Sequence, residues 1–131
     1  MEQNKGRFEM MVDASNTART MGSGSLEVLA TPAMVAMMEH AACNALEGKL
    51  EEGLTTVGIE MNVAHTSASP VGMKVWAEAV LTETDGRQFV FDIQAYDEAG
   101  VIGKAQHKRA SVKIEKFIKK TQEKLNQTSE K

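Results

Sequence analysis

The hydrophobic pattern of the chain changes its period near residue 53, and this change separates two kinds of structure. Between residues 31 and 46 almost every position is apolar around the full circumference of a helix. Thr31 is a natural N-cap and Pro32 suits the first helical position, so the pattern predicts a helix over residues 31–46. A helix that is apolar on all sides is typical of one enclosed by other structure. The rest of the chain is therefore expected to wrap around it.

After residue 53 the apolar positions recur at every second residue, as in strands with one buried face. The first such strand places four apolar side chains and a histidine in one row, which consists of Val57, Ile59, Met61, Val63 and His65. Further strands are predicted over residues 74–82, 89–96 and 101–114, with a hairpin turn at Asp85-Gly86 between the first two. The alternation breaks near Gly103, where we expect a bulge or a close backbone approach.

The remaining segments give weaker signals. Residues 7–12 are predicted to form the first strand, whereas residues 13–25 are too polar for a core element and are predicted to form a loop. Residues 1–6 and 126–131 are expected to be loosely held. A short amphipathic helix after the last strand is indicated by residues at helical spacing, namely Ile114, Phe117, Ile118, Thr121 and Leu125.

This order of elements predicts a fold. One strand, a long apolar helix and a four-strand antiparallel meander give an α+β structure in which a curved sheet wraps around one helix, the hotdog fold. We expect a single domain over residues 1–131, with its core at about residues 7–118. The edges of so small a sheet need protection, and hotdog proteins dimerise by joining two sheets edge to edge. A homodimer is therefore expected, and association of two dimers is left open.

Composition narrows the classes of partner. The net charge of −3 gives no reason to expect nucleic acid or an anionic membrane as a partner. No run approaches the roughly 18 apolar residues of a membrane span, and the polar start lacks a signal-peptide core, so we expect a cytoplasmic protein. Cys43 is the single cysteine, which excludes an intrachain disulfide and a cysteine-based metal site.

One carboxylate interrupts the apolar helix. Glu39 projects among apolar positions, away from the side that carries His40 and Asn44. A buried carboxylate must be hydrogen-bonded, paired or protonated, although Glu39 could also snorkel to solvent. His65 continues the row that should cover the helix, so we expect the Glu39 and His65 side chains to approach each other. Thr31 heads the helix, whose free backbone N–H groups could hold an oxyanion.

Three segments carry a resemblance to a known family: LEVLATPAMVAMMEHAACNAL, TTVGIEMNVAHTSASPVG and IGKAQHKRASV. They resemble the hotdog thioesterases related to the fluoroacetyl-CoA thioesterase, and the likeness extends over about residues 8–117. The resemblance implies a catalytic group made of a threonine before the helix, a glutamate two turns along it and a histidine on the following strand. The matching residues are Thr31, Glu39 and His65. The triple at this spacing is fairly specific, whereas each residue alone is a weak signal.

Thioester hydrolysis needs an activated nucleophile, a proton acceptor and donor, and stabilisation of an oxyanion. We assign His65 as the general acid/base. Glu39 is assigned to orient His65 or to act as base or nucleophile, and Thr31 to position water or attack, with the division between these two left open. The structural alternatives are that Thr31 is only an N-cap and that His65 is a structural histidine. His40 and His107 lack partners in the pattern and are assigned structural or surface roles.

A basic run near the end of the last strand contains Lys104, Lys108 and Arg109. The default interpretation is a solvated strand face. A CoA substrate needs cations for its phosphates, and Arg109 is our first candidate for such a contact. The segment MGSGS before the helix lacks the aromatic residues that should close over a fluoroacetyl group, so selectivity for fluoroacetyl is not expected.

Three functions follow from these observations. The leading one is an acyl-CoA thioesterase that acts on a small or medium acyl group without a metal or redox cofactor. The second is a hotdog dehydratase or hydratase that moves protons on an enoyl or hydroxyacyl thioester. The third is a non-catalytic acyl-CoA binding or regulatory protein, since a fold does not by itself carry activity. The pattern of Thr31, Glu39 and His65 favours hydrolysis.

Overall fold

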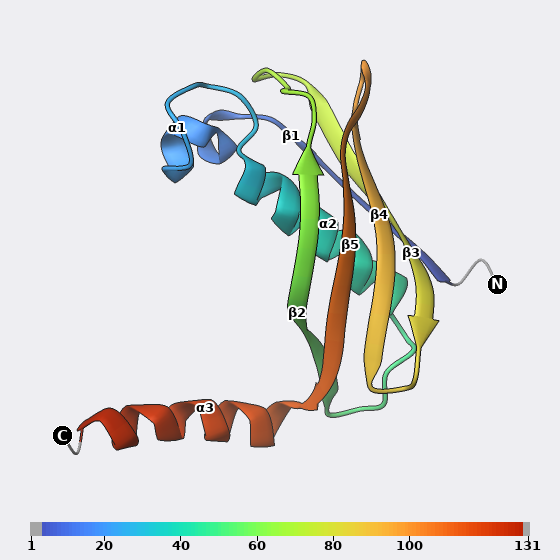
Figure 1. Cartoon of the computed structure of the whole chain (residues 1–131), viewed down its shortest axis with the longest axis vertical. Coiled ribbons are helices and arrows are strands. Elements are labelled where there is room, and N and C mark those ends of the chain that lie inside the picture. The colour runs from blue at the N-terminus through green and yellow to red at the C-terminus, as the bar shows by residue number, and fades with distance from the viewer. Residues whose placement is uncertain (1–3, 130–131) are drawn as a thin grey trace.

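The computed structural model describes residues 4–129, in which one antiparallel sheet curves around a central helix (Figure 1). In chain order the elements are β1 (Lys5–Met11), η2 (Ala14–Asn16), α1 (Ala18–Met21), α2 (Thr31–Ala45), β2 (Leu54–His65), β3 (Lys74–Thr84), β4 (Gln88–Asp97), β5 (Gly100–Lys113) and α3 (Ile114–Ser129). The sheet wrapped around α2 is the α+β arrangement that the sequence predicts.

The core lies between α2 and the concave face of the sheet. Seven of the 15 α2 residues are buried, and these are Ala33, Met34, Met37, Met38, Ala41, Ala42 and Ala45. The facing rows of the middle strands are buried as their alternation predicts, with Val75, Ala77 and Ala79 on β3 and Phe89, Phe91, Ile93 and Ala95 on β4. Each fully buried Val, Ile, Phe or Met side chain among them contributes about 1.5–3 kcal/mol. This packing fixes the position of α2 against the strands.

The strand order departs from the predicted meander. The strands lie in the order β1-β3-β4-β5-β2, and all pairs are antiparallel. The meander holds for β3, β4 and β5, but β2 pairs with β5 rather than with β3, so the four-strand meander is wrong at its first strand. Hydrophobic alternation fixes which face a strand buries and says nothing about its neighbour. As a result β2, with 12 residues, is one of the two edge strands.

A bulge in β2 changes the faces of its residues. Gly58 pairs with Arg109 and Glu60 with Lys108, so Ile59 has no partner across the ladder. Ile59 was predicted to face the helix and is instead 48% exposed. A bulge adds one residue to one strand, and the side chains before and after it then follow different alternations. Gly58 consequently faces α2, although the pattern places it on the other side.

The irregularity predicted near Gly103 is confirmed both as a bulge and as a close backbone approach. The register between β4 and β5 shifts beside this residue. A Cβ at Gly103 would lie 2.8 Å from the Met34 side chain and 2.9 Å from the carbonyl oxygen of Ala64. A glycine is therefore required where β5 passes both α2 and β2 closely.

The start of the chain is more ordered than predicted. β1 begins at Lys5, so residues 5 and 6 belong to the sheet, while residues 1–3 lie outside the described part. A Cβ at Gly6 would overlap the backbone of Ala41 and Ala45, which shows how closely β1 crosses α2. The predicted loop over residues 13–25 contains the short helical elements η2 and α1.

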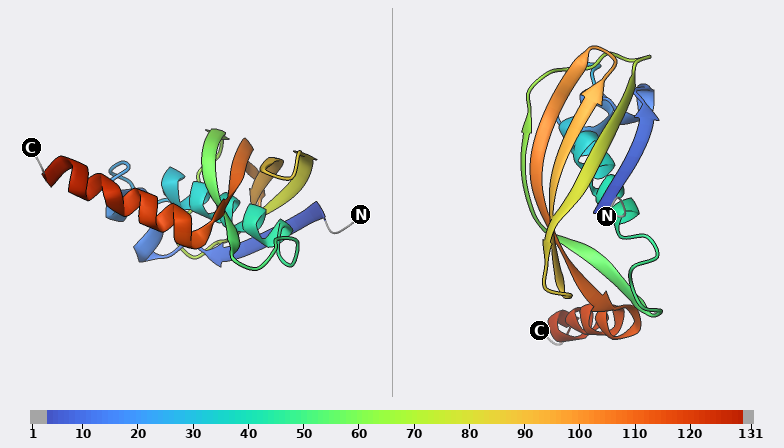
Figure 2. Two further views of the ribbon diagram at one scale, coloured as in Figure 1. Left: turned by 90° about the horizontal axis from the view of Figure 1, so that it is seen from below. Right: turned by 90° about the vertical axis from the view of Figure 1, so that its right-hand side faces the viewer.

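The last helix is longer than predicted and stands apart from the body. α3 leaves the foot of the sheet and projects past the β2 edge (Figures 1 and 2). Its apolar residues are accordingly exposed, with Phe117 at 36% and Leu125 at 66%. Residues 126–129 were predicted to be loosely held, and this is wrong because they belong to α3, whereas residues 130 and 131 lie outside the described part. Across the described chain, each helix is too short or too polar to cross a membrane.

Candidate active site

Thr31 and His65 meet at one end of the fold. Thr31 is the first residue of α2 and His65 is the last residue of β2, and the Thr31 Oγ1 and His65 Nδ1 atoms are 2.8 Å apart. The N-cap of α2 is Ala30 and no side chain caps the helix, so the N-cap role predicted for Thr31 is wrong. The Thr31 hydroxyl lies one position too far along the chain to cap, and it contacts the imidazole instead.

The imidazole of His65 is placed for proton transfer. Its Nε2 atom is buried, and the described residues provide no hydrogen-bond partner for it. A buried polar atom without a partner costs about 1–3 kcal/mol, which is typical of a site retained for function. Burial lowers the pKa of His65 below its usual 6.5, and a hydrogen bond with the Ser67 backbone opposes this shift. A neutral imidazole at pH 7 can accept a proton.

The start of α2 also offers hydrogen-bond donors. Pro32 has no N–H, and the Met34 N–H donates to the Ala30 carbonyl at 3.0 Å. The backbone N–H groups of Thr31 and Ala33 have no acceptor within the described chain. Free N–H groups and the partial positive charge of a helix N-terminus stabilise negative charge. The end of α2 beside His65 can therefore stabilise an oxyanion.

Glu39 lies in a different place, two turns along α2. Its side chain is 39% exposed, and its Oε2 atom lies 3.7 Å from Arg109 Nη1 and 4.0 Å from His107 Nε2. Gly58 faces it, because a Cβ there would lie 2.8 Å from the same oxygen. His65 is seven residues beyond Gly58 along β2, which corresponds to roughly 20 Å. The approach of Glu39 to His65 that we predicted does not occur within one chain.

Arg109 points inward from β5 and is 7% exposed. Its Nε donates to Thr56 Oγ1 at 2.9 Å, its Nη2 donates to the Thr56 carbonyl at 3.0 Å, and its Nη1 donates to His107 Nε2 at 3.1 Å. The solvated strand face predicted for this residue is therefore wrong. A contact with a CoA phosphate needs an accessible donor, and the donors of Arg109 are engaged inside the protein.

His107 lies beside Glu39 and Arg109, a position that the sequence analysis did not predict. It is 1% exposed, and because its Nε2 accepts from Arg109, its Nδ1 carries the proton and donates to the Glu60 carbonyl at 2.9 Å. Burial lowers the pKa of His107 and the charge of Arg109 adds to this, whereas the Glu60 carbonyl and Glu39 oppose it. The alternation along β5, in which Ala105, His107 and Arg109 share one row, was the signal that could have revealed it.

Comparison with known proteins identifies the family. A family model described as fluoroacetyl-CoA-specific thioesterase matches residues 12–115. The chain belongs to this family. The fluoroacetyl-CoA thioesterase of Streptantibioticus cattleyicolor is 38% identical over 98 residues, which cover 75% of this chain and 70% of that protein.

Solved structures agree with this assignment. A mutant of the fluoroacetyl-CoA-specific thioesterase superposes with a TM-score of 0.86 at 32% identity, covering 92% of this chain and 93% of that one. A mutant in complex with fluoroacetate and CoA gives 0.81 at 32% identity, covering 86% and 95%. A thioesterase superfamily member from Thermus thermophilus gives 0.83 at 28% identity, covering 93% of both chains. Membership of the family confirms the hotdog fold and thioester hydrolysis.

Proposed function

We propose that this member of the family hydrolyses the thioester of a small or medium acyl-CoA to a carboxylic acid and CoA. The observation that carries the proposal is the 2.8 Å contact between the Thr31 hydroxyl and the His65 imidazole beside the free N–H groups of α2. A CoA substrate is supported by the related structure that holds fluoroacetate and CoA. A cytoplasmic location stays a prediction.

The reaction follows from this geometry. His65 takes a proton from the nucleophile, which is the Thr31 hydroxyl or a water molecule that Thr31 positions. As the new C–O bond forms, the carbonyl oxygen becomes an oxyanion that accepts from the N–H groups of Thr31 and Ala33. The C–S bond then breaks, and His65 returns the proton to the CoA thiolate. If Thr31 attacks first, water releases the acid from the threonine ester in a second, equivalent step.

Glu39 enters the same site from a second copy of the chain in this proposal. β2 is an edge strand, and two such edges can pair antiparallel about a twofold axis. Pairing over the full length of β2 places Gly58 of the second copy roughly opposite Met61, about 13 Å from His65 instead of about 20 Å. The Glu39 side chain is 39% exposed, and the shorter separation is what supports its approach to His65 of the second copy. A homodimer is therefore part of the proposed function, with Glu39 orienting the imidazole or acting as the base.

The acyl group is expected to be small or medium and not restricted to fluoroacetyl. The segment before Leu26 carries no aromatic side chain, and the residues around it are exposed, with Met21 at 45%. A pocket that contacts a methyl-sized group discriminates weakly unless it makes a specific polar contact. We expect kcat/KM for acetyl-CoA and fluoroacetyl-CoA to agree within about tenfold.

The test is the release of free thiol from a panel of acyl-CoAs, from acetyl and fluoroacetyl to long-chain and aryl. His65→Ala and Thr31→Val, which removes the hydroxyl and keeps the β-branched shape, should each lower kcat/KM by roughly 10² or more. His40→Ala is the matched control, because His40 is on the same helix but stacks on Phe8 with ring centroids 3.7 Å apart. This control should keep its activity.

The outcomes separate the competing functions. Turnover that survives both substitutions would show that the site is elsewhere. Binding of CoA esters without any turnover would instead support the non-catalytic acyl-CoA binding protein. Thermal unfolding of each variant checks that a loss of activity does not come from a loss of folding.

A further inference from the structure

A groove with a one-sided charge lies where α3 leaves the sheet. Its lining includes Arg87 from the turn between β3 and β4, Lys113 from β5, and Lys116 and Lys120 from α3, with Phe117 between the two lysines. Its volume is about 680 Å³, and its lining includes no carboxylate, although the chain as a whole carries a net charge of −3. We call it the cationic groove.

A second groove along α3 shows that this charge is not a general property of the helix. Lys113, Lys116 and Lys119 contribute to it, but they are balanced by three carboxylates, those of Glu51, Glu52 and Glu115. Lys113 and Lys116 line both grooves. The cationic groove differs from the second groove because Arg87 and Lys120 join these two lysines there, whereas Lys119 and the three glutamates lie only in the second groove.

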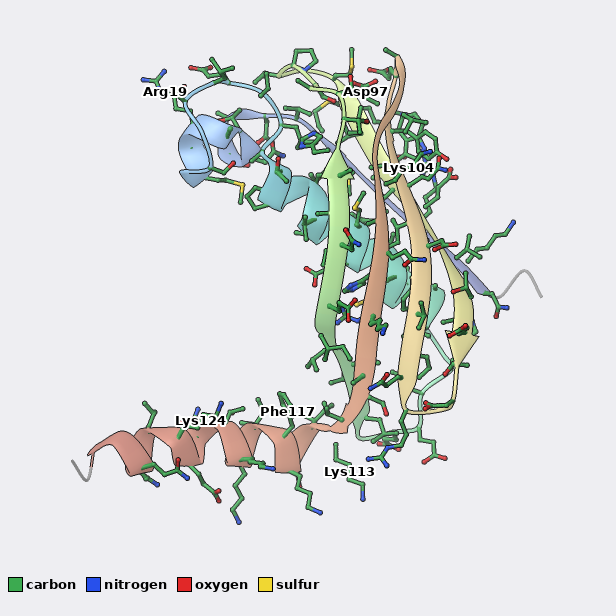
Figure 3. All side chains as sticks on the ribbon, in the orientation of Figure 1. Arg19, Asp97, Lys104, Lys113, Phe117 and Lys124 are labelled. Atoms are coloured by element: carbon green, nitrogen blue, oxygen red, sulfur yellow. The ribbon has the colours of Figure 1, made fainter. Side chains whose placement is uncertain are left out.

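The walls of the cationic groove are fixed by backbone hydrogen bonds. The Arg87 carbonyl accepts from the Ser111 N–H at 2.8 Å, which holds the β3–β4 turn beside β5. The Ile114 N–H donates to the Gly53 carbonyl at 3.0 Å, which holds the root of α3 beside the start of β2. Figure 3 shows α3 leaving this corner, with Phe117 near the junction and Lys124 farther out.

The four cations of the groove are available to a ligand. All four residues are exposed, and none of these four forms an ion pair with another described residue. Acids lie nearby as well. Three glutamates line the second groove beside Lys113 and Lys116, and the Asp85 carboxylate accepts the backbone N–H groups of Arg87 and Gln88 at 2.9 and 2.8 Å. Four like charges in one groove raise the local concentration of anions, and a ligand with several phosphates gains most from this.

We propose that the cationic groove binds the phosphates at the nucleotide end of CoA. The inference rests on the proposed function, which supplies an acyl-CoA substrate. CoA carries a pyrophosphate, a 3′-phosphate and an adenine. Lysine binds phosphate as a point charge, and arginine can bind it with two donors. Phe117, at 36% exposure, offers an aromatic face on which a base can stack. These residues take the role that the sequence suggested for Arg109, whose donors are buried.

The position of the groove suits a substrate whose thioester is cleaved in the second copy. The groove lies at the Leu54 end of β2, because the root of α3 is bonded to Gly53 there. Antiparallel pairing of two β2 edges sets this end beside His65 of the other copy. A CoA thioester at Thr31 and His65 of one copy would thus extend its phosphates toward α3 of the other.

Two double variants of the full-length protein test the proposal. Lys116→Gln with Lys120→Gln removes two charges from the groove, whereas Lys119→Gln with Lys124→Gln removes two from the same helix outside it. Each protein is assayed with acetyl-CoA and with the acetyl thioester of N-acetylcysteamine, which has no phosphates. The groove variant should raise the KM for acetyl-CoA by roughly threefold to thirtyfold, and added salt should shrink this difference. The truncated thioester should show no comparable change, and the control variant should resemble the wild type.

Several outcomes would overturn the inference. One is an equal KM for acetyl-CoA in the groove and control variants, with turnover otherwise normal, which would leave the thioesterase function intact. Another is an equal effect on both thioesters. If no thioester is hydrolysed, the proposed function fails, and calorimetric titration with adenosine 3′,5′-bisphosphate decides the groove by itself. Binding lost only in the groove variant supports the proposal. No binding, or binding only to vesicles that contain anionic lipid, refutes it.

Discussion

Two inactive variants should restore each other if the active site is shared between two copies. Glu39→Gln and His65→Ala should each lower activity by roughly 10² as homodimers. A heterodimer of the two holds one site with both residues intact and one site that lacks both. Its activity per dimer should therefore return to about half that of the wild type, roughly fiftyfold above either variant. The reason is geometric, since Gly58, which faces Glu39, lies roughly 20 Å from His65 along β2 of one chain.

A second heterodimer provides the reciprocal control. Here a wild-type copy is combined with a copy that carries both Glu39→Gln and His65→Ala. In a shared site each half then lacks one residue, so activity should stay near the level of the single variants. In a site built within one chain the wild-type copy would keep its own activity. A shared site therefore predicts activity in the first heterodimer and none in the second, whereas a site within one chain predicts the reverse.

The assay uses co-expressed copies with two different affinity tags, purified in succession so that only heterodimers remain, followed by thiol release from an acyl-CoA. The order of activities decides the result. If the heterodimer of the two single variants stays inactive while the wild-type heterodimer keeps about half the activity, the reasoning from the β2 edge is refuted. A single-copy mass in solution would refute it independently, because a monomer has no shared site.

Three further predictions concern local geometry and pH. Gly58→Ala places a methyl group 2.8 Å from Glu39 Oε2. It should lower kcat/KM by about tenfold or more, because the Glu39 carboxylate is pushed out of its position in the site. The urea midpoint should stay nearly unchanged, because the end of a flexible side chain can move aside. Gly6→Ala should instead lower the free energy of unfolding by about 1–3 kcal/mol, measured in urea, because the new methyl group meets the backbone of α2. Burial lowers the pKa of both His65 and His107 from 6.5, so the folded state binds fewer protons than the unfolded chain near that pH. The melting temperature should therefore be maintained at pH 7 and fall as the pH drops below about 6.5, and this fall should be less steep in His107→Asn. In the pH profile of kcat/KM, the loss of activity on the acidic side should lie below pH 6.5, because a protonated His65 cannot accept a proton.

The parts of the fold that the sequence predicts well depend on one element at a time. The span of α2 follows from its continuous apolar surface and Pro32, and the buried faces of β3 and β4 follow from strict alternation. The break in the alternation at Gly103 predicted the close backbone approach that the structure shows there. The bulge at Ile59 left no such mark in the sequence. Val57 and Ile59 are both apolar and Gly58 has no side chain, so the apolar spacing runs on unchanged although the faces change at the bulge.

The candidate site was harder to predict, because it depends on pairs of elements. The sequence and its resemblance indicated Thr31, Glu39 and His65, and the structure brings only the first and the last together. Because β2 pairs with β5, His107 and Arg109 lie beside Gly58 and close to Glu39, and the composition of β2 does not reveal this neighbour. The register across two strands is a long-range property that local patterning does not encode.

The start of α2 shows most directly how local stability and chemistry compete in this protein. A serine, threonine or aspartate at the N-cap would stabilise the helix by about 1 kcal/mol, and it would do so by accepting from the backbone N–H groups of the first turn. Ala30 occupies that position, and Thr31, one residue later, directs its hydroxyl to His65. Because Pro32 has no N–H, a capping side chain here would have engaged the N–H of Ala33, which is one of the two donors proposed for the oxyanion. The absence of a cap thus leaves unpaired the groups that a thioester needs. The start of α2 thus departs from the usual preference for a capping side chain without an added stabilising contact to the helix, and such a departure is expected at a functional site.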